Sequence, residues 1–144
     1  MAKPSKSSVA IELWEKLTSG FENSRNFYAK KIFELGLTVP QFNVLNLLYT
    51  KGPLTLKKIS EAMFVTGANI TCVVDNLEKE DLVKRVFSSN DRRMIFAHLT
   101  PTGKERIEKI LPHFYETIGK IFSKYSETEQ KQLAKLLTKL ENPE

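Results

Sequence analysis

The sequence predicts a mainly α-helical domain that carries one small β-hairpin. Apolar residues recur at spacings of three and four over most of the chain, as on one face of a helix, and this period changes to two over residues 82–99. The length of 144 residues, with 41% hydrophobic and 27% charged side chains, is typical of a single globular domain. We therefore expect one domain over residues 1–144, with a compact lobe at 37–100 and a helical region at 9–35 and 101–141.

Capping residues predict where the first two helices begin and end. The first helix, over residues 9–35, ends before a glycine that suits a helix C-terminus. Thr38 and Gln41 are spaced as a capping box, so the second helix begins there. Gly52 and Pro53 end it, since neither continues a helix well.

Two shorter helices are predicted in the middle of the chain, separated by a turn of three residues. The first covers residues 56–63, and we expect Ile59, Ala62 and Met63 to face inward. The second runs from Gly67 to about residue 80. Its inward face has the i, i+3, i+4, i+7 spacing of one helix stripe: Ile70, Val73, Val74 and Leu77.

The change of period marks a β-hairpin, and two more helices follow it. Residues 82–87 and 94–99 read as strands, and the polar segment between them forms a charged tip. Thr100 caps the next helix. Ser126 and Glu129 form a second capping box, which opens the last helix.

Helix, three-residue turn, helix and hairpin together have the layout of a winged helix-turn-helix. A helix fits the major groove of DNA, and a hairpin beside it reaches the neighbouring minor groove. Small and amide side chains near the start of the second helix suit close approach to bases, and its free N–H groups suit a phosphate. The candidate reading residues are Thr66, Gly67, Ala68, Asn69, Thr71 and Cys72.

The hairpin tip carries the second candidate set, Ser89, Asn90, Asp91, Arg92 and Arg93. An isolated arginine pair at a turn often serves only solubility. A flanking aspartate is better explained as a brace that holds one guanidinium in a fixed pose. A braced arginine suits the narrow, strongly negative minor groove of A·T-rich DNA.

Several of these segments together resemble the MarR family of bacterial transcription regulators. The segments are residues 37–45, 54–56 and 76–85, and the wing Asp91-Arg92-Arg93 followed by Leu99-Thr100-Pro101-Thr102-Gly103. The resemblance implies an obligate homodimer formed by the first and last helices, and repression at a pseudo-palindromic operator. It further implies that Arg93 enters the minor groove with Asp91 as its brace, and that Arg85 supports the wing through a salt bridge.

The resemblance also implies a small lipophilic or phenolic effector that shifts the dimer between DNA-competent and incompetent forms. Two positions depart from the family pattern. Asp81 stands where a glycine is usual, so it must adopt a left-handed conformation. Cys72 replaces a common basic residue, which is expected to alter the operator; its role is either a small contact residue or an oxidant sensor.

Other function classes find little support. The net charge of +5 favours a polyanionic partner, although the excess is spread along the chain. One cysteine, His98 and His113 are a poor set for a metal, and we expect both histidines to be partly buried. We expect no enzyme, no cofactor, no membrane span, no secretory signal at the basic N-terminal start, and a cytoplasmic location. The alternative function is a winged-helix interaction or architectural module without strong sequence specificity.

Overall fold

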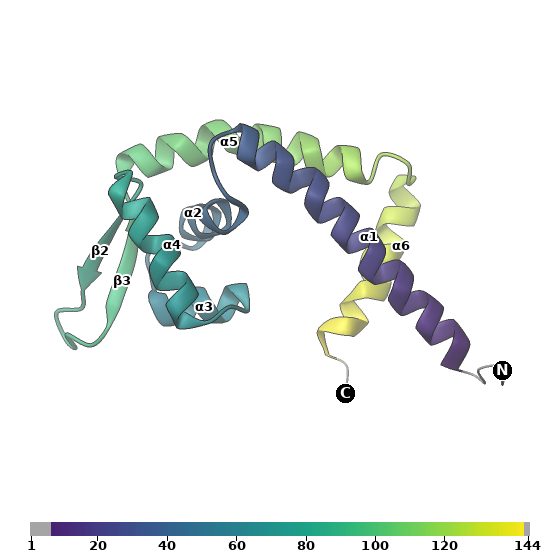
Figure 1. The fold of residues 1–144 in the computed structure, drawn as a ribbon, viewed down its shortest axis with the longest axis horizontal. Coiled ribbons are helices and arrows are strands. Elements are labelled where there is room, and N and C mark those ends of the chain that lie inside the picture. The colour runs from purple at the N-terminus through teal and green to yellow at the C-terminus, as the bar shows by residue number, and fades with distance from the viewer. Residues whose placement is uncertain (1–6, 143–144) are drawn as a thin grey trace. The chain divides into compact units, whose positions relative to one another are not determined.

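A computed structural model describes residues 7–142 as a mainly helical chain with a small antiparallel sheet (Figure 1). The basic N-terminal start lies outside the described residues. The elements, in chain order, are α1 (Ser7–Glu34), α2 (Val39–Lys51), β1 (Leu54–Thr55), α3 (Leu56–Met63), α4 (Gly67–Lys79), β2 (Val83–Phe87), β3 (Ile95–Leu99), α5 (Pro101–Ile121) and α6 (Glu127–Glu141). The predicted fold class, mainly α with a hairpin wing, is confirmed.

Both predicted capping boxes are present. At the start of α2, the Thr38 side chain accepts from the backbone N–H of Gln41 at 3.3 Å, and the Gln41 side chain accepts from the Thr38 N–H at 2.9 Å. Ser126 and Glu129 form the same pair of bonds at the start of α6, at 3.2 and 2.7 Å. These bonds satisfy N–H groups that have no partner inside the helix.

The sheet has three strands in the order β1-β3-β2, one more than the hairpin that the sequence predicts. β2 and β3 pair from Val83 opposite Leu99 to Phe87 opposite Ile95. β1 adds two residues on the other side of β3, with Leu54 opposite Ala97. A strand of two residues is too short to show a period of two in the sequence, and it is defined only by its pairing with a distant strand. The sequence therefore predicted only two of the three strands.

The hydrophobic core lies in the part of the chain that contains the sheet. Every buried hydrophobic side chain among residues 7–142 lies between Ile32 and Leu111. The predicted inward face of α4 is confirmed, since all four of its residues are buried. The prediction for α3 was partly wrong: Ala62 is exposed, and Ser60 is buried beside Ile59. Ser60 tolerates burial because its hydroxyl donates to the Lys57 carbonyl at 2.8 Å.

The chain divides into two compact units. One runs from Ala29 to His113 and contains the sheet; the other comprises the described residues of Met1–Tyr28 and Phe114–Glu144. The first unit is larger than the lobe expected at 37–100. It includes the end of α1 and the first half of α5 because side chains from both, such as Ile32 and Ile107, are buried in its core.

Candidate nucleic-acid interface

The first turns of α4 present the candidate reading residues. Thr66 is the N-cap, and its hydroxyl accepts from the Asn69 N–H at 3.3 Å. Ala68, Asn69, Thr71 and Cys72 are all exposed, because the opposite side of the helix is buried. The structure therefore brings these predicted residues together on one solvent-facing helix end, where free N–H groups favour an anion.

The turn between α3 and α4 has the predicted length of three residues. It begins at Phe64, which adopts a left-handed conformation with φ 54° and is 95% exposed. Such a conformation is uncommon for an aromatic residue. It ends α3 abruptly, and the chain then turns so that Thr66 can cap α4.

The end of α4 explains why Asp81 must be left-handed. Asp81 has φ 58°, as its departure from the family's glycine predicts. The N–H groups of Asp81 and Leu82 bond to the carbonyls of Glu78 and Leu77, each at 3.0 Å, which is the Schellman pattern. Thr100 then donates its hydroxyl to the Asp81 carbonyl at 2.6 Å. These bonds fix the point at which the wing leaves the reading helix.

The wing tip is a tight turn with an exposed arginine. The Ser88 hydroxyl accepts from the N–H of Asn90 at 3.2 Å, and the Ser88 N–H donates to the Met94 carbonyl at 2.9 Å. Asp91 Oδ1 accepts from both the backbone N–H and Nε of Arg93, at 3.0 and 3.3 Å. The expected contact between Asp91 and Arg93 is therefore present, and the Arg93 side chain is 93% exposed. Ser89, Asn90 and Arg92 are exposed beside it.

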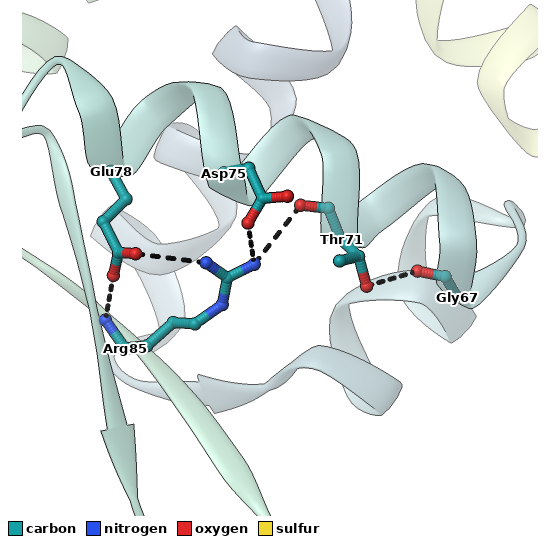
Figure 2. Close-up of polar contacts among 5 residues, drawn as sticks. All are labelled: Gly67, Thr71, Asp75, Glu78 and Arg85. Carbon is teal, nitrogen blue, oxygen red and sulfur yellow. Dashed lines mark hydrogen bonds and ion pairs between the residues drawn. The ribbon is translucent and has the colours of Figure 1, made fainter.

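Arg85 does not contact the wing tip but is bound to α4 (Figure 2). Its Nη2 lies 2.6 Å from Asp75 Oδ1, and its Nη1 lies 3.1 Å from Glu78 Oε1. The sequence placed Arg85 near the base of the wing without naming a partner, and it missed both carboxylates. Their spacing of three residues on one helix was the available signal, since it puts them on the same helix face.

The exposed first turns of α4 carry no basic side chain of their own. The basic residue of α4 is Lys79 in its last turn, whereas Arg92 and Arg93 are on the wing tip and Lys57 and Lys58 are on α3. All five side chains are exposed. The positive charge available for phosphates is therefore on α3 and the wing tip, and not on the first turns of α4.

The described residues give little support for other kinds of site. Within residues 7–142, no group of three histidine, cysteine or acidic side chains is arranged to hold a metal ion. His98 is half-buried as expected, but His113 is exposed, because it lies off the buried stripe of α5. None of the described helices is long and apolar enough to cross a membrane.

A helix-turn-helix followed by a hairpin wing defines the class of winged-helix DNA-binding proteins. The model of the MarR family matches residues 37–95. The uncharacterized HTH-type transcriptional regulator YkoM of Bacillus subtilis is 35% identical over 130 residues, covering 90% of this chain and 84% of that protein. The chain belongs to the MarR family of transcriptional regulators, as its resemblance predicted.

Solved structures have the same fold. One is from work on how 6-hydroxynicotinic acid regulates DNA binding by BpsR of Bordetella bronchiseptica, with a TM-score of 0.83 and 23% identity, covering 91% of this chain and 99% of that chain. Another is a mutant MarR from Escherichia coli complexed with operator DNA. Its TM-score is 0.83 at 20% identity, covering 95% of this chain and 99% of that chain.

Proposed function

We propose that this protein binds a pseudo-palindromic operator as a cytoplasmic homodimer, represses the adjoining gene, and is released by a small lipophilic or phenolic effector. The observation that carries the proposal is the exposed Arg93, held by Asp91 at the wing tip. The E. coli protein of the same fold was solved with operator DNA, which supports a DNA-binding role for this fold. The proposal assigns the protein no catalytic role.

In the proposed complex, the start of α4 and the wing tip contact different grooves of the DNA. The start of α4 enters the major groove, where Asn69 pairs with an adenine edge, Ala68 and Thr71 offer methyl groups to thymine, and Cys72 is a small contact residue. Thr66 and Gly67 lie against a phosphate at the helix N-terminus. Arg93 enters the adjacent minor groove, and the other residues of the tip flank it along the backbone.

The dimer is inferred from apolar side chains that one chain leaves in water. No hydrophobic side chain is buried in the described part of the unit formed by residues 7–28 and 114–142. Leu13 and Phe21 on α1 are 64% and 63% exposed, and Leu136 and Leu140 on α6 are 53% and 57% exposed. Apolar helix faces such as those of α1 and α6 are rarely left exposed to solvent in a monomeric protein. A second copy of the chain is the partner that the family implies.

Sedimentation velocity tests the dimer. Leu136→Asp together with Leu140→Asp is expected to convert a dimer to monomers, because the new charges would be buried without partners. Thr138→Asp is the control, since Thr138 lies on the opposite side of α6 and is exposed. A monomeric wild-type protein, or a dimer unaffected by the paired substitution, would contradict this assignment.

Fluorescence anisotropy with DNA from upstream of the protein's own gene tests operator binding. Unrelated DNA competes at near-physiological salt. Arg93→Ala is expected to weaken binding by about 1–3 kcal/mol and to reduce the salt slope by about one. Lys109→Ala removes one positive charge from α5 and is the control. Weak binding, equal on both DNAs and unaffected by Arg93→Ala, would instead support an interaction or architectural module.

Release by an effector is tested on the same operator complex. The BpsR work concerns regulation of DNA binding by 6-hydroxynicotinic acid, a small aromatic acid. That compound and simple phenols are therefore suitable first probes. A true effector dissociates the operator complex at a concentration that leaves the homodimer intact, because it shifts the dimer between two forms. A compound that dissociates the dimer or unfolds the protein does not qualify.

A further inference from the structure

Three charged side chains join the reading helix α4 to the wing strand β2 (Figure 2). Asp75 and Glu78 belong to α4, and Arg85 belongs to β2. Besides the two ion pairs, Arg85 Nη2 donates to the Thr71 carbonyl at 3.3 Å, and the Arg85 backbone N–H donates to Glu78 Oε2 at 3.0 Å. Arg85 therefore binds two successive turns of the helix.

These contacts bind the Arg85 guanidinium to α4 and leave little of it open to solvent. Its side chain is 19% exposed, compared with 93% for Arg93. Its charge is opposed by two carboxylates, so the three groups together carry one net negative charge. An arginine held in this way adds little attraction to DNA, although it lies between the two elements that approach the grooves.

The carboxylates themselves oppose DNA binding. The Asp75 and Glu78 side chains are 49% and 42% exposed on the helix that reads the bases. A negative charge near the phosphates lowers affinity for every DNA sequence equally. Affinity alone therefore does not explain these two residues. A fixed geometry does, because bases are read only when α4 and the wing enter neighbouring grooves in register.

We infer that Asp75 and Glu78 are positioning residues that act through Arg85: they hold β2 in one orientation on α4 and raise discrimination between operator and other DNA, while lowering affinity for DNA in general. The inference rests on the proposed operator binding. It predicts opposite changes in two quantities when a carboxylate is neutralised: the affinity for non-operator DNA rises, and the ratio of operator to non-operator affinity falls. A loss of stability alone would not produce this pair of changes.

Asp75→Asn tests this separation, because it keeps the shape of the side chain and removes its charge. Affinity for non-operator DNA is expected to rise about threefold through the lost repulsion. The ratio of operator to non-operator affinity is expected to fall about tenfold, the equivalent of one charge-assisted hydrogen bond. Affinity for the operator itself then falls about threefold.

Glu80→Gln is the matched control, because Glu80 is exposed at the end of the same helix and is in none of the ion pairs found among the described residues. It changes the charge equally and is expected to raise both affinities together, with an unchanged ratio. Arg85→Lys keeps the positive charge, but one ammonium group cannot bind Asp75 and Glu78 through two separate nitrogens as the guanidinium does. It should therefore lower the ratio of operator to non-operator affinity without raising the affinity for non-operator DNA.

The outcomes distinguish this inference from the function on which it rests. If wild-type protein shows no preference for operator DNA, the proposed function fails, and the inference fails with it. If the preference is present but Asp75→Asn behaves like Glu80→Gln, the carboxylates act only as charges and the positioning role is overturned. Hydroxyl-radical footprints give a second readout: weakened protection at the minor groove in Asp75→Asn and Arg85→Lys supports a loosened wing, and wild-type protection in both overturns it.

Discussion

Gly103 lies where the first turn of α5 meets the backbone at the start of the wing, and Gly103→Ala tests how rigid that contact is. Gly103 is buried, and its N–H donates to the Thr100 hydroxyl at 2.9 Å. A Cβ at this position would overlap the carbonyl oxygen of Leu82 and lie 2.9 Å from Leu99 Cδ1. Leu99 can change rotamer, but the Leu82 carbonyl cannot, because it is fixed between the end of α4 and the start of β2.

The expected loss of stability in Gly103→Ala follows from the backbone that must move to make room for the added Cβ. Overpacking a core typically costs about 1–3 kcal/mol. Here the first turn of α5 must also withdraw from two hydrogen bonds made by Thr100, to the Leu82 carbonyl at 3.1 Å and the Asp81 carbonyl at 2.6 Å. With roughly 1 kcal/mol for weakening these bonds, we expect Gly103→Ala to lower the free energy of unfolding by about 3 kcal/mol. In a chain of this length that is a fall in Tm of about 6–12 °C.

Thermal and urea unfolding followed by circular dichroism measures this loss. All variants must be compared at one protein concentration, because the proposed dimerisation would make the apparent stability depend on concentration. Gly119→Ala is the control: Gly119 is in the same helix, and its added Cβ meets nothing within 4 Å. That substitution is expected to stabilise the protein by about 0.5–1 kcal/mol. If Gly103→Ala unfolds within about 0.5 kcal/mol of wild type, the Leu82 contact is not rigid and the reasoning is refuted.

Two smaller effects are expected at the ends of the reading helix. Asp81→Gly should raise the free energy of unfolding by about 0.5–1 kcal/mol in urea denaturation, since glycine adopts φ 58° without strain; unchanged stability would mean that Asp81 is unstrained. Thr66→Ala should lower it by about 1 kcal/mol through loss of the bond to the Asn69 N–H. Thr66→Ser keeps the hydroxyl and should restore most of that stability, and a Ser variant as unstable as Ala would argue against capping.

Much of the fold could be predicted because its signals are local. A capping box needs only two residues three apart, as at Thr38 and Gln41, and both boxes lie where the sequence indicates. The inward face of α4 was also predictable, since a run of β-branched and leucine side chains at helical spacing has one way to be buried. The contact between Asp91 and Arg93 spans two residues, so it too follows from a local turn.

What the sequence missed depends on contacts between distant residues or on very short elements. β1 exists only because Leu54 and Thr55 pair with β3, more than forty residues away. The spacing of Asp75 and Glu78 puts them on one face of α4, but their pairing with Arg85 depends on how β2 lies against that face, which the sequence of neither element determines. In α3, eight residues define a stripe poorly, and Ala62 has too little apolar surface to decide which side faces inward.

The distribution of charge indicates how this reading helix must work. Its exposed N-terminal turns carry no basic side chain, and its C-terminal half carries Asp75 and Glu78. For the proposed operator, attraction must therefore come from the wing tip and α3, and from the N–H groups at the start of α4. In the proposed operator complex, base contacts by Asn69, Thr71 and Cys72 would then add selectivity with little general affinity. Because neutral contacts of this kind are short and directional, they require the wing and helix to be held in a fixed relation, as Arg85 holds them.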